Sequence, residues 1–165
     1  MSIVLLMEIV SLIIEKATIK DLSKISELMS KQAEDEREFI HFNKKEDFSF
    51  YTLSDIKKVL TSLNCLMLLA KLNGKVVGCG LAKIEDAPSW SKHKKQGYLG
   101  MLYVDKNYRR HGIAKAIREA RIKWLKSKGI KLLACLVLIK NIPAIAFAHK
   151  DGFKPNSTWM FKEMP

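Results

Sequence analysis

The segment from Met101 to Ile117 constrains the fold of this 165-residue chain more than any other. It opens with an apolar run, Met101 to Val104, that predicts a strand, and Gly112 begins a stretch with helical periodicity. Basic Arg109 and Arg110 lie between them. The first N–H groups of a helix have no partner within the helix, and the helix dipole adds partial positive charge there. A strand that leads into a helix through a basic turn therefore predicts an anion site.

The composition limits the class of protein. A chain with 48% hydrophobic and 28% charged residues predicts one globular domain over residues 1–165, in which residues 1–10 form an apolar extension. The apolar N-terminal stretch contains Glu8 and lacks a basic leading segment, and it is too short to span a membrane. Cys65, Cys79 and Cys135 have no paired spacing, so we expect reduced, buried thiols in a cytoplasmic protein.

The net charge of +12 indicates an affinity for anions. Nucleic acid, an acidic membrane and a phosphate-rich cofactor are the candidate partners, and a lysine-rich surface without a polyanion partner is the alternative. Basic residues concentrate in 92–95 and in 109–128, and the second group surrounds the predicted anion site. No helix-turn-helix, zinc-finger or RNA-recognition signature is present, so only the charge favours a nucleic-acid-binding module.

Periodicity and turn residues predict a mixed α/β fold with a parallel strand pair joined through a helix. In chain order we expect a strand at 11–17, a helix from Asp21, a helix capped by Ser54, a hairpin of 65–71 and 75–84 around Asn73-Gly74, a strand at 96–104, a helix at 112–128, a strand at 131–139, a helix at 143–150 and a final strand pair ending near Glu163.

Details within these elements are also predicted. The helix after Ser54 should bury Ile56, Val59, Leu60 and Leu63, and the basic residues of the 112–128 helix should face water. Gly97 and Gly100 indicate a bulge or a close backbone approach in their strand. The run 131–139 is almost continuously apolar, as is typical of an interior strand buried on both faces.

Two motifs resemble those of the GNAT family of N-acetyltransferases. Arg109, Gly112 and Ala114 give the spacing R-x-x-G-x-A, which is similar to the family's acyl-coenzyme-A-binding motif (Q/R-x-x-G-x-G/A). The run from Asn141 to Phe153 resembles the C-terminal signature, a helix with Asn and Ala followed by a Gly-Phe turn. The resemblance implies a mixed sheet of six to seven strands, splayed between the fourth and fifth strands and flanked by about four helices.

The same resemblance implies acetyl-CoA as co-substrate and places its binding residues. The pantetheine arm would lie in the opening of the sheet against backbone groups of Leu102, Tyr103 and Val104, and Asn141 would bond to it. The helix around Ala144 to Phe147 would flank the thiol. The diphosphate would rest beside Arg109 on the backbone amides of Arg110, His111, Gly112, Ile113, Ala114 and Lys115.

The chain departs from the family pattern at the positions for proton transfer. The position of the family's general-acid tyrosine is Ala148, and no glutamate lies around Gly100 on the fourth strand. The candidate substitutes are Glu85, Tyr98 and His149, each of which also has an ordinary structural explanation. His41, His93 and His111 show no metal spacing, so we expect no metal.

The resemblance implies that the segment between the first two helices helps to shape the acceptor site. Acids concentrate there in a basic chain, together with Phe39, Phe42, Phe48, Phe50 and Tyr51; the acids are Glu34, Asp35, Glu36, Glu38, Glu46 and Asp47. We expect a cationic acceptor such as a small amine, a polyamine, an aminoglycoside-like compound or a peptide amine. Three functions stay open: an N-acetyltransferase, a CoA-binding protein with weak or lost catalysis, and a nucleic-acid-binding module. If the N-terminal extension adds a strand at an interface between two copies of the chain, the protein would form a homodimer.

Overall fold

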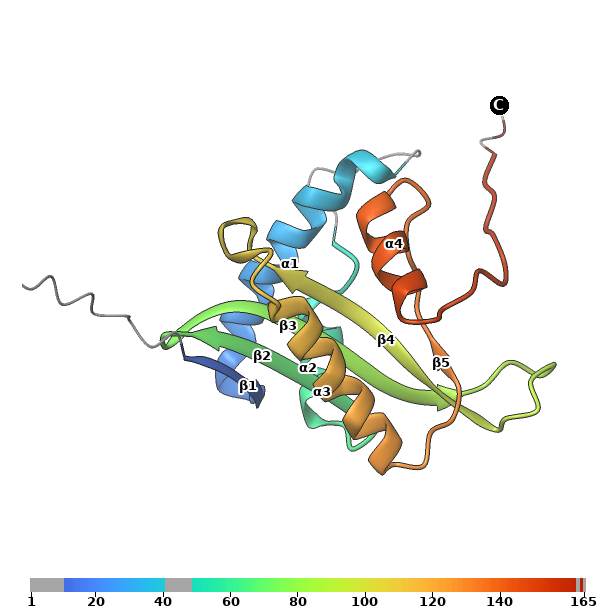
Figure 1. The fold of residues 1–165 in the computed structure, drawn as a ribbon, viewed down its shortest axis with the longest axis horizontal. Coiled ribbons are helices and arrows are strands. Elements are labelled where there is room, and N and C mark those ends of the chain that lie inside the picture. The colour runs from blue at the N-terminus through green and yellow to red at the C-terminus, as the bar shows by residue number, and fades with distance from the viewer. Residues whose placement is uncertain (1–10, 41–48, 163, 165) are drawn as a thin grey trace, which may run out of the picture.

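The computed structural model describes residues 11–40, 49–162 and 164 (Figure 1). The predicted apolar extension, 1–10, lies outside the described residues. The main elements are β1 (Leu12–Lys16), α1 (Leu22–Glu36), α2 (Leu53–Thr61), β2 (Cys65–Leu72), β3 (Lys75–Asp86), β4 (Lys95–Val104), α3 (Ile113–Ser127), β5 (Leu133–Ala134) and α4 (Ile142–Lys150). Short 3-10 turns occur at Ile19–Asp21, Arg37–Phe39 and Lys106–Tyr108.

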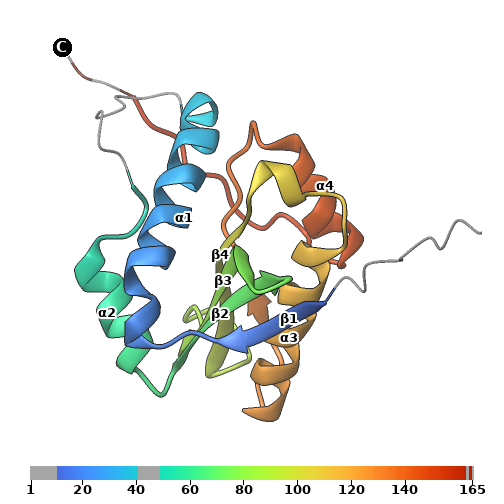
Figure 2. The ribbon, with the colours of Figure 1, turned by 90° about the vertical axis from the view of Figure 1, so that its left-hand side faces the viewer.

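The strands of the described residues form one mixed sheet in the order β1-β2-β3-β4-β5. The pairs from β1 to β4 are antiparallel, and β4 and β5 are parallel. Helices α1 and α2 lie on one side of the sheet, and α3 and α4 lie on the other (Figure 2). The predicted mixed α/β fold is confirmed.

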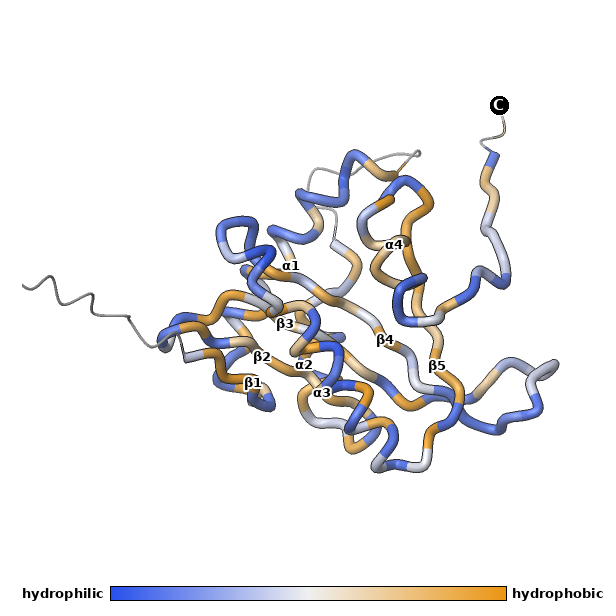
Figure 3. The backbone as a smooth tube through the Cα atoms, viewed as in Figure 1, coloured by the Kyte–Doolittle hydropathy of each residue, from blue (hydrophilic) through white to orange (hydrophobic). Residues whose placement is uncertain are grey.

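Successive side chains of each strand point to opposite faces of the sheet, so the core consists of two apolar layers. Met67, Leu69 and Met101 face α1 and α2, whereas Ala70 and Val77 belong to the layer under α3. Figure 3 shows apolar positions along the central strands and a strongly polar turn between β4 and α3. Burying one Ile or Leu side chain contributes about 1.5–3 kcal/mol, so these layers fix the orientation of β4 and α3.

The hairpin between β2 and β3 turns at Asn73-Gly74, as predicted. Asn73 has a φ of 48° and Gly74 a φ of 79°. Both residues are therefore left-handed, the conformation that a tight two-residue hairpin turn requires and that Asn and Gly adopt most readily. The Asn73 side chain also accepts a hydrogen bond from the Ser11 N–H at 3.0 Å.

Strand β4 contains a bulge at the predicted glycine. Gly80 pairs with Leu102 and Ala82 pairs with Leu99, so the ladder advances two residues along β3 and three along β4. Gly100 and Met101 therefore lie together opposite Leu81, which interrupts the ladder and increases the local twist. The bulge is the feature of β4 that matters most for the site described below.

Close packing explains the other glycine of β4. A Cβ at Gly97 would lie 2.6 Å from a methyl carbon of Leu125 on α3. Any larger residue would push α3 away from the sheet. Gly97 is thus a point of close helix approach, as the sequence suggested.

The predicted helix starts were partly wrong. Helix α2 begins at Leu53, and its cap is Thr52, whose hydroxyl accepts from the Asp55 N–H at 3.1 Å; Ser54 is inside the helix. Helix α1 begins at Leu22 with Asp21 as its N-cap residue, as predicted. Asp21 also accepts from the Thr18 N–H at 2.7 Å, which forms a Thr-x-x-Asp capping box on the 3-10 turn before α1. Thr52 and Asp55 form the same box at the start of α2.

Three further predictions about burial and strands were wrong. Leu63, expected in the core, is 90% exposed, because α2 ends at Thr61. Only Leu133 and Ala134 of the run 131–139 pair as a strand, and Leu136 is 70% exposed, because the chain diverges from β4. Residues 153–162 form no strand and run away from the sheet (Figure 1), so the described sheet has five strands instead of six to seven.

Candidate active site

The sheet opens between β4 and β5, as the sequence predicted. The parallel ladder joins only Gly97 to Leu133 and Tyr98 to Ala134, with one further bond from the Gly97 N–H to the Leu132 carbonyl at 2.9 Å. Beyond Tyr98 no described strand pairs with this edge of β4. The ladder therefore leaves this edge of β4 open, although Arg121 donates to the Gly100 and Met101 carbonyls and Arg109 donates to the Val104 carbonyl.

A cleft of about 330 Å³ occupies the opening. Its walls come from every layer of the fold: Tyr98 to Leu102 of β4, Cys135 to Leu138 after β5, Asn141, Ala144, Phe147 and Ala148 of α4, Arg118 and Arg121 of α3, Gln32 and Glu36 of α1, and Phe50, Tyr51, Asp151 and Phe153 from the connecting segments. A mostly apolar cleft with a few convergent polar groups is the usual form of a small-molecule site.

The turn before α3 presents unbonded amides at the start of the helix whose Arg118 and Arg121 line the cleft. Arg110 and Gly112 both have positive φ, 69° and 76°, and Gly112 is the N-cap of α3. Within the described residues, no protein group accepts a hydrogen bond from the N–H groups of Arg110 to Lys115. Backbone N–H groups that converge at a left-handed turn and a helix N-terminus form an anion site. Arg110, His111 and Lys115 are exposed, as such a site requires.

Arg109 holds this turn against α1. Its Nε donates to the Val104 carbonyl at 2.9 Å, and its Nη2 donates to the Asp35 carboxylate at 2.6 Å. Lys106 also pairs with Asp35, at 2.7 Å. Asp35 is therefore occupied here and is not free to bind an acceptor. Direct contact of Arg109 with a diphosphate stays a prediction.

The predicted pantetheine residues lie around the cleft in different ways. Leu102 lines it, whereas Tyr103 and Val104 are not among the lining residues and bury their side chains in the core layers. Asn141 caps α4, since its Oδ1 accepts from the Ala144 N–H at 3.2 Å. Its side-chain amide N–H groups remain available to the cleft.

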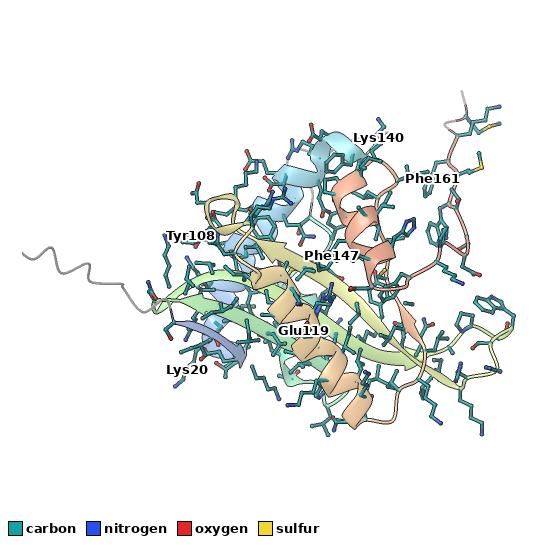
Figure 4. The ribbon with its side chains drawn as sticks, in the orientation of Figure 1. Lys20, Tyr108, Glu119, Lys140, Phe147 and Phe161 are labelled. Atoms are coloured by element: carbon teal, nitrogen blue, oxygen red, sulfur yellow. The ribbon has the colours of Figure 1, made fainter. Side chains whose placement is uncertain are left out.

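An ion pair fixes α4 to α3 at the rim of the cleft. Arg118 of α3 lies 2.6 Å from Asp151, and each side chain is only 13% exposed. The Arg118 guanidinium also stacks 4.6 Å from the centre of the Phe147 ring. Figure 4 shows Phe147 on the side of α4 that faces α3. These contacts set the width of the cleft on this side.

The structure brings one of the three predicted catalytic residues to the cleft. Tyr98 lines it, and burial raises the pKa of Tyr98 to about 12. Glu85 is not among the lining residues and bonds instead to Gln96 at 3.0 Å and Lys83 at 3.1 Å. His149 is exposed, because it lies one residue beyond the lining Ala148 on a helix and neighbouring residues point about 100° apart.

A buried cation under the bulge was not predicted. Arg121, expected to face water, is 2% exposed and donates to the carbonyls of Leu81 at 2.9 Å, Gly100 at 3.1 Å and Met101 at 3.3 Å. Burial lowers the pKa of Arg121 to about 10. Its spacing of four residues from both Ile117 and Leu125 was the signal that placed it on the buried face.

Glu36, predicted only as one acid among several, lies in the cleft wall. Burial raises the pKa of Glu36, although a hydrogen bond from Gln32 at 3.1 Å opposes the rise. Glu34 and Glu38 are exposed, and Glu46 and Asp47 lie outside the described residues. A half-buried carboxylate in an otherwise basic protein is a suitable contact for a cation.

The sequence and the fold agree with one family. A family profile described as the acetyltransferase (GNAT) family matches residues 22–153. The chain belongs to the GNAT family. The matched range contains the cleft, the turn before α3 and α4, so the family match and the geometry concern the same part of the molecule.

Solved structures of GNAT proteins share the fold at low sequence identity. An aminoglycoside acetyltransferase from an uncultured soil metagenomic sample, in complex with sisomicin, is 21% identical with a TM-score of 0.70 over 93% of this chain and 97% of that one. Aminoglycoside N-acetyltransferase AAC(6′)-Iy in complex with CoA is 18% identical (TM-score 0.72; 94% and 95%). A predicted acetyltransferase from Clostridium acetobutylicum with acetyl-CoA is 20% identical (TM-score 0.73; 93% and 96%).

The described residues hold neither a candidate metal site nor a candidate membrane-spanning helix. They contain no group of three or more His, Cys, Asp or Glu residues that could hold a metal ion. None of their helices has the length and apolar character needed to cross a bilayer.

Proposed function

We propose that this GNAT protein transfers the acetyl group of acetyl-CoA to a primary amine by direct attack in a ternary complex. The observation that carries the proposal is that α3 has unbonded amides at its N-terminus and also contributes Arg118 and Arg121 to the cleft beside the edge of β4. The unbonded amides of Arg110 to Lys115 suit the diphosphate, and the free edge of β4 suits the amide groups of the pantetheine arm. Arg110, Lys115 and the other basic residues of α3 add the charge that a phosphate-rich molecule requires.

The residues present fit this co-substrate. Nothing lies within 4 Å of the place where a Cβ would stand on Gly112, so a bulky diphosphate has room beside the turn. Asn141 can donate to the pantetheine arm, and Ala144 and Phe147 line an apolar path toward the bulge. When bound, acetyl-CoA would supply the activated acetyl group, while the protein supplies position and polar contacts.

The proposed acceptor is a cationic amine, and Glu36 is its contact in the cleft wall. A raised pKa brings a carboxyl group closer to neutrality, where it accepts a proton more effectively as a general base. Glu36 can therefore bind the ammonium form and remove its proton. The complex of a structural neighbour with sisomicin supports a polycationic small molecule over an anionic one. A polyamine or a peptide amine has the same chemistry.

The remaining step needs a polarised carbonyl. Backbone N–H groups on the open edge of β4 can donate to the thioester oxygen, and buried Arg121 adds positive charge beneath the bulge. Tyr98 stays a candidate within the same cleft. The reaction then requires only that the amine and the thioester be held together.

Thiol release tests the proposal. Calorimetry should detect acetyl-CoA binding, and a thiol reagent should report CoA release that depends on added polyamines or aminoglycosides, with an acetylated product seen by mass spectrometry. Absence of acetyl-CoA binding would refute both the transfer and the cofactor site, and activity confined to anionic acceptors would refute the role of Glu36.

One observation favours a second candidate. Ala148 lines the cleft without a hydroxyl group, which suits a CoA-binding protein with weak or lost catalysis. Binding of acetyl-CoA without amine-dependent thiol release, across the whole amine panel, would identify that function.

A further inference from the structure

The hydroxyl of Tyr51 lies at the bulge of β4. A Cβ built on Gly100 would stand 2.9 Å from this hydroxyl oxygen, so only glycine leaves room for it. The Tyr51 side chain packs against the core layer under α1 and lines the cleft. It reaches the bulge from the segment between α1 and α2, which is the wall opposite α4.

The backbone on both sides of Tyr51 is fixed. The Ser49 hydroxyl donates to the Tyr51 carbonyl at 2.9 Å, and Thr52 begins the capping box of α2. The ring is thus held by a turn before it, a helix after it and the core beneath it. A side chain held in this way loses little conformational freedom when a substrate binds.

The close contact with Gly100 places the Tyr51 hydroxyl, and the side chain lies in the wall of the cleft. The hydroxyl carries one hydrogen, which it can donate to a ligand in the cleft. The phenol is protonated at neutral pH, since burial raises the pKa of Tyr51, although the Met101 backbone N–H opposes the rise. Tyr51 is therefore a proton donor in the wall of the cleft.

The other acidic groups of the cleft are less suited to donate. Asp151 is paired with Arg118 at 2.6 Å, and Glu36 faces the amine in the proposed reaction. Tyr98 is close to the bulge as well, but a carbon of its ring approaches Gly100, whereas Tyr51 approaches with its hydroxyl oxygen. Cys135 has a pKa raised by burial and is a weak hydrogen-bond donor.

We propose that Tyr51 is the general acid that protonates the departing CoA sulfur, in place of a hydroxyl at position 148. This inference rests on the proposed acetyl transfer. The amine nitrogen forms a bond to the carbonyl carbon, the C–S bond breaks with its electron pair on sulfur, and the Tyr51 hydroxyl gives its proton to that sulfur. Glu36 takes the first proton from the bound ammonium group before attack and passes it to solvent. It then takes the second proton, which the nitrogen loses as the amide forms, and solvent returns a proton to the Tyr51 phenolate.

The charges around Tyr51 suit this exchange. Buried Arg121 of α3 and Lys83 of β3 stabilise the phenolate, and Asp55 of α2 opposes it. Tyr98 of β4 is a neighbouring titratable group, and the charge of ionised Tyr51 raises the pKa of Tyr98. The phenolate therefore forms only during the transfer and is reprotonated afterwards.

The experiment compares Tyr51→Phe with Tyr98→Phe and with Tyr108→Phe as a control. Tyr108 loses a hydroxyl that bonds to Lys75 at 2.9 Å, away from the cleft. Because a general acid contributes about 10²–10⁴-fold, we expect Tyr51→Phe to lower kcat by at least about 10²-fold with the acetyl-CoA Kd and the thermal midpoint unchanged. Tyr108→Phe should match the parent protein.

A second measurement separates proton donation from packing. A fluorinated tyrosine at position 51 has a more acidic hydroxyl and the same ring. It should move the basic limb of the kcat pH profile to lower pH, because the donor must stay protonated. The same replacement at position 98 should leave that limb in place.

Several results would overturn the inference. Tyr51→Phe with full kcat, a larger loss in Tyr98→Phe, an unmoved basic limb, or a loss confined to acetyl-CoA affinity each removes Tyr51 from proton transfer. If the parent protein binds acetyl-CoA but releases no thiol with any amine, the proposed function fails and the inference fails with it. If the parent protein acetylates amines, only the variants decide the role of Tyr51.

Discussion

Arg121 donates a hydrogen bond from its Nη1 to the carbonyl of Gly100 at 3.1 Å, across the interface between α3 and the bulge of β4. The same atom also donates to the carbonyls of Leu81 and Met101. A bulge leaves carbonyls without ladder partners, and in a buried setting each unpaired carbonyl costs free energy. A side chain of α3 thus makes an irregular strand stable in the middle of the fold.

Replacing Arg121 with Met should destabilise the protein. The loss of donors to buried carbonyls outweighs the relief of removing a buried charge, so we expect the free energy of unfolding to fall by about 2 kcal/mol. Urea denaturation measures the change, and Lys123→Met, an exposed position on α3, is the control. A variant as stable as the parent would mean that water replaces the guanidinium under the bulge.

The Arg118–Asp151 pair should couple α3 to α4. Both side chains are largely buried, so the double-mutant cycle of Arg118→Met and Asp151→Asn should give a coupling energy of about 1–2 kcal/mol. We also expect each single variant to raise KM for acetyl-CoA, because α4 carries Asn141 and Phe147. Chemical denaturation and initial-rate kinetics check the two effects, and strictly additive stabilities would contradict the coupling.

Local patterns predicted the parts of the fold that short-range chemistry decides. Asn73-Gly74 specified its turn, and Gly97 and Gly100 marked the irregular strand, because each depends on backbone conformation or on one close neighbour. The unbonded amides before α3 follow from the strand, turn and helix order of one segment. The Thr-x-x-Asp capping boxes at Thr18 and Thr52 are also patterns of neighbouring residues, so the sequence contains the signal for these two helix starts.

Long-range relationships could not be predicted in the same way. Hydrophobicity alone cannot show that the run 131–139 leaves β4 after Ala134, since an apolar residue also fits the wall of a cleft. The approach of Tyr51 to Gly100 joins segments far apart in the chain, and no local pattern carries that information. The turn before α3 was therefore predictable from the sequence, and its role in cofactor binding stays a prediction, whereas the place of the acidic and phenolic groups on the opposite wall needed the structure.

Gly112→Ala should weaken acetyl-CoA binding more than it weakens folding. Alanine at a φ of 76° costs about 1–2 kcal/mol, and relief of that strain would rotate the amides of the turn. Gly74→Ala is a matched control, since Gly74 has a φ of 79° and open space around its Cβ but lies in the β2–β3 hairpin, outside the turn before α3. We expect similar losses of stability in both variants and a higher acetyl-CoA Kd by calorimetry in Gly112→Ala alone. Equal affinities would remove this turn from the cofactor site.

Glu36→Gln should stabilise the protein near neutral pH while lowering activity. Burial raises the pKa of Glu36 above the ordinary value of 4.5, so the folded state favours the protonated form. Its contribution to stability is present below pH 4.5 and is lost as the pH rises through the folded-state pKa. The variant should therefore unfold at a higher temperature than the parent at pH 7, and the difference should shrink toward pH 4.

Activity should change in the opposite sense. The parent kcat should fall on the acid side as Glu36 becomes protonated, and Glu36→Gln should lose this limb together with about 10²-fold of kcat, the lower end of a general base's contribution. Glu34→Gln, at an exposed position on the same helix, is the matched control for charge and should retain both the activity and the limb. If Glu34→Gln and Glu36→Gln lose activity equally, the two carboxylates act only by long-range electrostatic attraction of the acceptor, and Glu36 is not the base.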